Sequence, residues 1–184
     1  MLLNEEYKLK NNAKLTLCAV MSALAVVIVL AAYFPYLTYA LPAMAGLCIM
    51  VVLIEINAKW AFLTYLSSAI ISFFIAESEA KLLFICIFGY YPILKALIEK
   101  LRNSVFEWVI KLIYFNATII LVYFLLSGLF AVSTEDFGIL GQYGAYIFLG
   151  AANLVFVLYD ICVSRMAMFY LYKLQPKISR VFKI

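Results

Sequence analysis

Histidine is absent from the 184-residue chain, and its absence removes whole classes of chemistry. Zinc sites, haem sites and most acid–base catalysis near neutral pH use an imidazole group. The cysteines do not replace it, because they lie singly in apolar runs and form no CxxC pair: Cys18, Cys48, Cys86 and Cys162. Each is expected to be a free thiol that behaves as a small hydrophobic side chain. The sequence therefore predicts no metal site and no cofactor.

Catalytic and nucleotide-binding motifs are also missing. The chain has no HExxH, GxSxG or P-loop pattern, and no pair of intramembrane carboxylates spaced for a proton relay. We expect no enzymatic activity, so a transporter containing this chain would need a separate protein to hydrolyse ATP. The net charge of +4 does not indicate nucleic-acid binding, because the basic residues lie at the ends of apolar runs.

Charged residues are scarce and apolar residues abundant. Only 13% of the residues are charged and 68% are hydrophobic, with a mean hydropathy of +1.07. An ordinary soluble domain is about half apolar and about a quarter charged. A soluble protein of this length could not bury so much apolar surface, so the sequence predicts an all-α integral membrane bundle.

Six apolar runs divide the chain into one transmembrane domain over residues 1–184. Six spans of about 20 residues consume about 120 residues and leave only short connections. The expected spans are approximately 15–34, 40–54, 60–75, 82–98, 105–130 and 143–172. Gly89 and Pro92 lie inside the fourth span, where they predict a kink.

The basic residues predict the orientation of these spans. With the N-terminus inside, 13 of the 14 lysine and arginine residues fall on inner segments and Lys81 alone falls outside. The positive-inside rule therefore places both termini in the cytoplasm of a multi-pass plasma-membrane protein. Acidic residues gather on the outer connections 76–81 and 131–142.

The first span carries small residues at helical spacing. Ala19 and Ala23 are four residues apart, with Ser22 beside them. Such a face lets another helix approach closely in lipid. It indicates either packing against the protein's own helices or docking onto a partner subunit.

Polar residues inside the apolar runs are the second signal. Asn116 and Asn153 lie within consecutive antiparallel spans, so they either hydrogen-bond to each other or line a pocket open to the outside. Thr64, Ser68 and Ser72 form one helical face of hydroxyls, which favours packing.

Asp160 is an acidic residue near the inner end of the sixth span. We expect Ser164 and Arg165 to help satisfy its carboxylate. An acid inside the membrane is a candidate functional residue, and its depth indicates either a structural ion pair or an interface with a partner.

Tyrosines concentrate at the predicted outer ends of the spans. They mark the membrane interface in general, and beside the outer polar residues they also form a candidate pocket for a flat solute. The predicted substrate contacts are Tyr36, Glu79, Lys81, Asn116, Tyr143, Tyr146 and Asn153.

With six spans, an inside N-terminus and the Ala19/Ala23 face, the chain resembles the substrate-binding S-components of energy-coupling factor (ECF) vitamin transporters. The topology matches over the whole chain, and the sequence-specific part covers about residues 14–34. No residue set specific for thiamine, riboflavin, biotin or folate is present. The lack of histidine argues against the nickel and cobalt members.

The resemblance implies that the chain binds a small organic micronutrient from outside. It also implies that Ala19 and Ala23 dock onto a transmembrane coupling subunit, with cytoplasmic ATPases driving release inside. The alternative is a scaffold of a membrane complex without transport activity, similar to the rod-shape-determining MreD-like proteins. In that case Asn116 and Asn153 bond only to each other.

The predicted topology can be tested by cysteine labelling in a background without the native cysteines. We expect a membrane-impermeant thiol reagent added outside to label Ser133→Cys and not Ser104→Cys, because the basic residues hold the 99–103 connection inside. Labelling of Ser104→Cys alone would invert the topology.

Overall fold

The computed structural model describes residues 11–34, 37–101, 103–129 and 144–175, and within these ranges every regular element is helical. The helices are α1 (Asn11–Leu30, extended by a short 3-10 turn, Ala31–Tyr33), α2 (Ala40–Glu55), α3 (Ala58–Ile75), α4 (Ser78–Leu83), α5 (Tyr91–Ile98), α6 (Ser104–Leu129) and α7 (Gly144–Phe169). A π-helical segment, Phe84–Phe88, follows α4 and leads to α5. Another, Tyr170–Leu174, continues α7. The predicted all-α polytopic bundle is confirmed.

Five of the spans are long and apolar enough to cross a membrane, and α4 and α5 together make one of them. The remaining span, α2, is apolar but has only 16 residues. At about 1.5 Å per residue it extends for about 24 Å, somewhat less than the ~30 Å hydrocarbon core.

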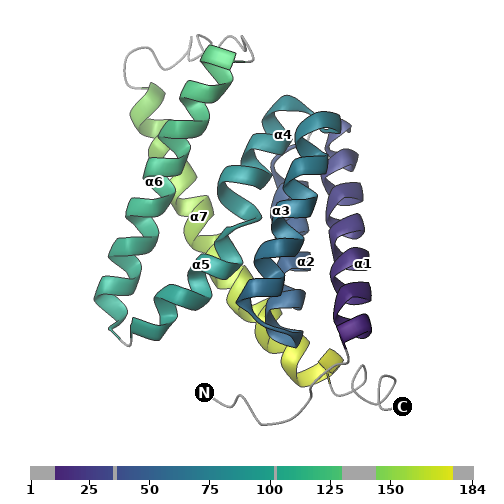
Figure 1. Ribbon diagram of the computed structural model, residues 1–184. Coiled ribbons are helices and arrows are strands. Elements are labelled where there is room, and N and C mark those ends of the chain that lie inside the picture. The colour runs from purple at the N-terminus through teal and green to yellow at the C-terminus, as the bar shows by residue number, and fades with distance from the viewer. Residues whose placement is uncertain (1–10, 35–36, 102, 130–143, 176–184) are drawn as a thin grey trace.

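The free ends of α1 and α7 lie at the same end of the bundle (Figure 1). We call this the inner end and the opposite one, where α3 meets α4, the outer end, following the predicted topology. In the segment that continues α7, the Tyr170 hydroxyl donates to Glu55 Oε1 at 2.8 Å, which ties this segment to the end of α2.

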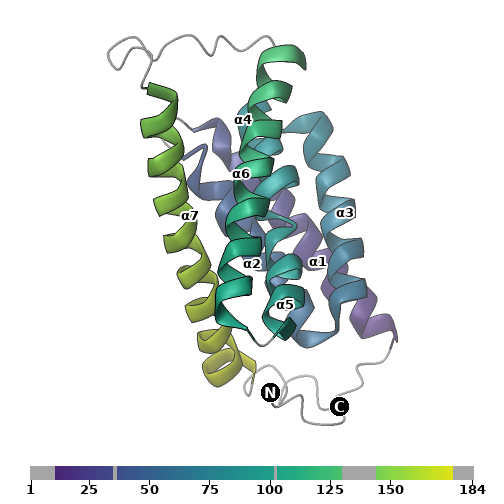
Figure 2. The ribbon, with the colours of Figure 1, turned by 90° about the vertical axis from the view of Figure 1, so that its left-hand side faces the viewer.

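Helices α1, α2, α3 and α4 pack on one side of the molecule, and α6 and α7 form a pair on the other (Figures 1 and 2). Small residues at the contacts of the first group allow close approach in lipid. Ala25, Ala45 and Ala80 are fully buried there. Ser22 Oγ and Ser67 Oγ are 2.8 Å apart and join α1 to α3.

The hydroxyl face of α3 is buried within this group. Thr64 donates to the Trp60 carbonyl, and Ser68 donates to the Thr64 carbonyl, each at 2.9 Å. Both are almost completely buried, as is Ser72. Thr64 and Ser68 therefore agree with the packing interpretation, whereas Ser72 Oγ has no hydrogen-bond partner among the described residues.

Span 4 is broken between Phe84 and Pro92, where the sequence predicted a kink. Gly89 N donates to Phe84 O at 2.8 Å, one residue beyond the regular helical acceptor, Ile85 O. Pro92 has no N–H and cannot donate to Phe88 O. The break therefore frees main-chain carbonyls in the interior of a membrane bundle, where they need other partners.

Three tyrosine hydroxyls from three other helices provide those partners. Tyr65 of α3 donates to Ile85 O at 2.7 Å. Tyr114 of α6 donates to Cys86 O at 2.9 Å, and Tyr159 of α7 donates to Phe88 O at 3.4 Å. The helices on both sides of span 4 therefore hold it at its weakest point.

Helix α2 approaches the break closely at Gly46. A Cβ atom added there would lie 2.4 Å from Phe88 O and 2.9 Å from the Tyr159 hydroxyl. Both distances are shorter than any van der Waals contact, so only glycine fits.

We expect Gly46→Ala to lower the stability of the protein by about 1–3 kcal/mol, because the methyl group displaces the backbone of the break. Gly150→Ala is the matched control, since a Cβ there meets nothing within 4 Å. Alanine is also the better helix former, by about 1 kcal/mol. Unfolding by SDS in mixed micelles measures both variants, and equal stabilities would contradict the predicted close contact at Gly46.

Candidate functional site

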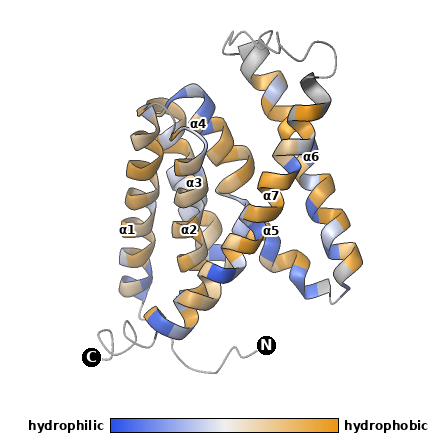
Figure 3. Ribbon diagram, turned by 180° about the vertical axis from the view of Figure 1, so that it is seen from behind, coloured by the Kyte–Doolittle hydropathy of each residue, from blue (hydrophilic) through white to orange (hydrophobic). Residues whose placement is uncertain are grey.

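A charge cluster lies between α5, α6 and α7 towards the inner end, and we define it by six residues: Tyr91, Lys95, Glu99, Glu107, Lys111 and Asp160. Figure 3 shows hydrophilic stretches on α5 and on the inner half of α7, within otherwise hydrophobic helices. Three of the charged members, Lys95, Lys111 and Asp160, are buried, with exposed fractions of 6%, 1% and 4%.

Asp160 of α7 is the centre of the cluster. Its Oδ1 accepts a hydrogen bond from the Tyr91 hydroxyl and forms an ion pair with Lys95, both on α5. Lys111 Nζ of α6 lies 3.2 Å from Oδ1 and 3.3 Å from Oδ2. The carboxylate of Asp160 therefore joins three helices, which are α7 itself, α6, and α5 of the broken fourth span.

Two glutamates complete the cluster on its inner side. Glu107 lies 2.6 Å from Lys111, and Glu99 lies 3.0 Å from Lys95 and 3.6 Å from Lys111. The Glu99 side chain is 45% exposed, so this part of the cluster reaches solvent or lipid head groups. Three carboxylates against two ammonium groups leave one formal negative charge, which lies best at this exposed edge.

Helical spacing explains how the sequence builds the cluster. Tyr91, Lys95 and Glu99 follow each other at intervals of four residues on one face of span 4, and Glu107 and Lys111 have the same spacing on α6. In the sequence, Lys95 and Lys111 count only as basic residues on the inner side of the membrane. Their position inside predicted spans was the available signal that they are buried.

The predicted partners of Asp160 were wrong. Ser164 donates to the main-chain carbonyl of Asp160 at 3.0 Å and not to the Asp160 carboxylate. Arg165 is exposed. A side chain four residues further along the same helix reaches the backbone more easily than a carboxylate that points into a neighbouring helix. Asp160 does form an ion pair with Lys95, which is the first of the two alternatives, and an interface with a partner stays a prediction.

Asn116 and Asn153 pair across α6 and α7. Each Nδ2 donates to the other's Oδ1 at 3.0 Å. Each also donates to a carbonyl of its own helix at 2.8 Å, Leu112 O and Leu149 O respectively. Both N–H groups of each amide are used, as the packing alternative expects. Binding of a solute by these two residues stays a prediction.

The predicted outer contacts on α4 have separate neighbours. Glu79 Oε2 accepts from the Tyr39 hydroxyl at 3.3 Å, whereas the Lys81 ammonium lies 5.5 Å from the centre of the Phe73 ring. Tyr36 and Tyr143, and the side chain of Tyr146, lie outside the described residues. The four described contacts therefore form two groups, one on α4 and one between α6 and α7.

Glu77 begins the outer connection into α4, and its Oε2 is buried without a hydrogen-bond partner among the described residues. Burial raises the pKa of Glu77 above its usual value, and the charge of Glu79 raises it further. Because folding disfavours the carboxylate form, lowering the pH through this pKa favours the folded connection.

Ala19 and Ala23 both lie on the exposed face of α1, although Cys18, Ser22 and Ala25 on the same helix are buried. The described helices of this chain therefore leave the small-residue face open. Comparisons with protein-family models, with curated proteins and with solved structures find no match for the chain.

We expect Asp160→Ala to lower the stability by about 3–5 kcal/mol, because it leaves two buried ammonium groups without their shared carboxylate. Arg165→Ala is the control on the same helix, and its exposed side chain should contribute less than about 1 kcal/mol. SDS unfolding again measures both. A similar loss in the two variants would show that the cluster does not hold α5, α6 and α7 together.

Proposed function

We propose that this protein is the membrane-embedded substrate-capture subunit of an ECF-type transporter. It would bind a small organic, vitamin-like solute from outside the plasma membrane. It would then dock onto a transmembrane coupling subunit whose cytoplasmic ATPases supply the energy.

The observation that carries the proposal is the exposed Ala19/Ala23 face of α1. The buried small residues of the same helix already pack against α2, α3 and α4. In lipid, small residues at four-residue spacing favour close helix contact. A face of this kind that the protein's own helices do not cover is suited to a helix of another subunit.

The solute is expected in the outer half of the bundle, near Glu79, Lys81 and the outer tyrosines. The three charged residues that the structure shows as buried overall, Lys95, Lys111 and Asp160, lie at the inner end, in the charge cluster. In this proposal the cluster is an internal anchor between α5, α6 and α7, and it does not contact the solute.

The second candidate is a scaffold of a membrane complex, and the Asn116–Asn153 pair favours it. The two amides satisfy each other's donors and need no ligand. The exposed face of α1 would then contact a structural partner, and ATPases would not accompany it.

Purification of the complex from native membranes tests the proposal. We expect the wild-type chain to retain one multi-pass subunit and ATPases that carry the P-loop motif. Ala19→Leu and Ala23→Leu should lose them at least tenfold, because a bulky residue prevents close helix approach. The isolated variants should remain as stable as the wild type, since both positions are exposed.

Ala117→Leu is the matched control, because Ala117 is an exposed alanine on α6. Mass spectrometry of small molecules extracted from the isolated chain provides a second readout. A retained multi-pass partner without ATPases, together with no bound solute, would support the scaffold instead. Unfolding of isolated Ala19→Leu would contradict the docking face.

A further inference from the structure

Helices α6 and α7 are joined to each other by a pair of amides and a pair of aromatic rings. The Asn116–Asn153 pair links them, and the rings of Phe115 and Phe156 stack at 4.3 Å between centroids with an interplanar angle of 13°. Polar contacts join this pair to span 4: Tyr114 and Tyr159 contact the break, Asp160 contacts α5, and Lys111 contacts Glu99 in the turn that follows α5. We call this helix pair the arm.

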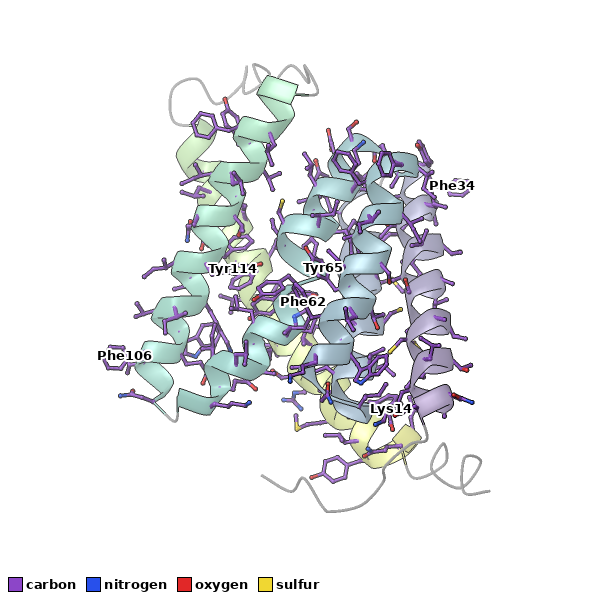
Figure 4. All side chains as sticks on the ribbon, viewed as in Figure 1. Lys14, Phe34, Phe62, Tyr65, Phe106 and Tyr114 are labelled. Carbon is purple, nitrogen blue, oxygen red and sulfur yellow. The ribbon has the colours of Figure 1, made fainter. Side chains whose placement is uncertain are left out.

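The arm meets the break from one side and α3 meets it from the other. Figure 4 shows Tyr114 and Tyr65 on opposite sides of span 4. Tyr65 belongs to the α1–α4 group and holds Ile85 O, whereas Tyr114 and Tyr159 belong to the arm and hold Cys86 O and Phe88 O. Separation of the arm would break the last two hydrogen bonds and keep the first.

We propose that Tyr114 and Tyr159 form a latch, and that the arm opens at its outer end when the latch releases the break in span 4. In lipid, apolar contact between helices gives little net driving force, so packing and hydrogen bonds decide which helices stay together. The break bends at low cost, because Gly89 and Pro92 have already removed regular helical hydrogen bonds there.

The magnitudes decide which end opens. Loss of one hydrogen bond between neutral groups changes an equilibrium about fivefold. Disruption of a buried ion pair costs several times more free energy, because each partner would be left charged and unpaired. Lys95, Lys111 and Asp160 are therefore the pivot at the inner end, and the two tyrosines are the part that yields.

The proposal rests on the proposed function in one respect only, which is that the open arm would admit the solute to the outer half of the bundle. Opening would also expose the carbonyls of Cys86 and Phe88 to water from the outer side. Water can replace the tyrosine hydroxyls as donor there, so the open state leaves no polar group of the break unsatisfied.

Double electron–electron resonance on the full chain in lipid nanodiscs tests the latch without any ligand. The four native cysteines are replaced by alanine, and spin labels are attached at pairs of exposed positions. The outer pair is Phe74 on α3 with Phe124 on α6, which are 78% and 66% exposed. The inner pair is Leu15 on α1 with Val105 on α6, and Phe74 with Val27 is the reference inside the α1–α4 group.

We expect Tyr114→Phe and Tyr159→Phe each to raise the ratio of open to closed outer distances about fivefold, which is the effect of one lost hydrogen bond. The double variant should raise it by about 25-fold where the two effects add. The inner pair and the reference pair should keep their wild-type distances. These results are independent of solute binding, so they remain informative if the proposed function fails.

Tyr65→Phe is the matched control, because it removes the same hydroxyl contact with the same segment from the side that does not move. It should change the outer ratio less than twofold. The latch is wrong if Tyr65→Phe acts like Tyr114→Phe, if the inner distance changes as much as the outer one, or if the monodisperse double variant keeps a single wild-type outer distance.

Pro92→Ala gives a second test that needs no double tyrosine variant. It supplies the N–H that Phe88 O lacks, so Tyr159 is no longer the only donor for this carbonyl. In this background Tyr159→Phe should change the outer ratio less than twofold, whereas Tyr114→Phe should keep its effect of about fivefold. Equal effects of the two tyrosine variants would contradict the role of Phe88 O.

Discussion

Lipid offers no hydrogen bond to a protein backbone, so every main-chain carbonyl that the break in span 4 frees needs a partner within the protein. Three carbonyls between Ile85 and Phe88 would be unsatisfied if span 4 stood alone. Tyrosines of α3, α6 and α7 satisfy them, so the arrangement of these helices around span 4 follows from one proline and one irregular turn. Gly46 lets α2 reach the same point, so helices α2, α3, α6 and α7 all contact span 4 at or near its break.

The charge cluster meets the same constraint with ionised groups. Burial of one lysine in a membrane bundle is costly, but Lys95 and Lys111 share Asp160 and keep Glu99 and Glu107 at the more exposed edge. The cluster therefore fixes the inner end of α5, α6 and α7. The neighbouring contacts of Tyr114 and Tyr159 with the break are neutral hydrogen bonds, which are individually weaker than contacts between buried charges.

A substrate-capture subunit needs both an entrance for its solute and a surface for its energising partner. The outer parts of α6 and α7 and the helix α1 lie on opposite sides of the molecule in Figure 1, with α3 and α4 between them. A scaffold would also use the α1 face, but it would have no need for an arm that opens.

The sequence by itself determined the all-α bundle of apolar helices, because about 20 apolar residues in lipid can satisfy their backbone only as a helix. It also located the kink, since Pro92 lacks an N–H wherever it is placed. Only the tertiary structure decided the partners. Lys95, Lys111 and Asp160 are far apart in the chain, and the positive-inside rule counts a lysine without regard to what its ammonium group contacts. Which tyrosines face the break and which alanines of α1 stay exposed likewise depend on how the helices pack against one another, and helix packing is a long-range property that local spacing does not contain.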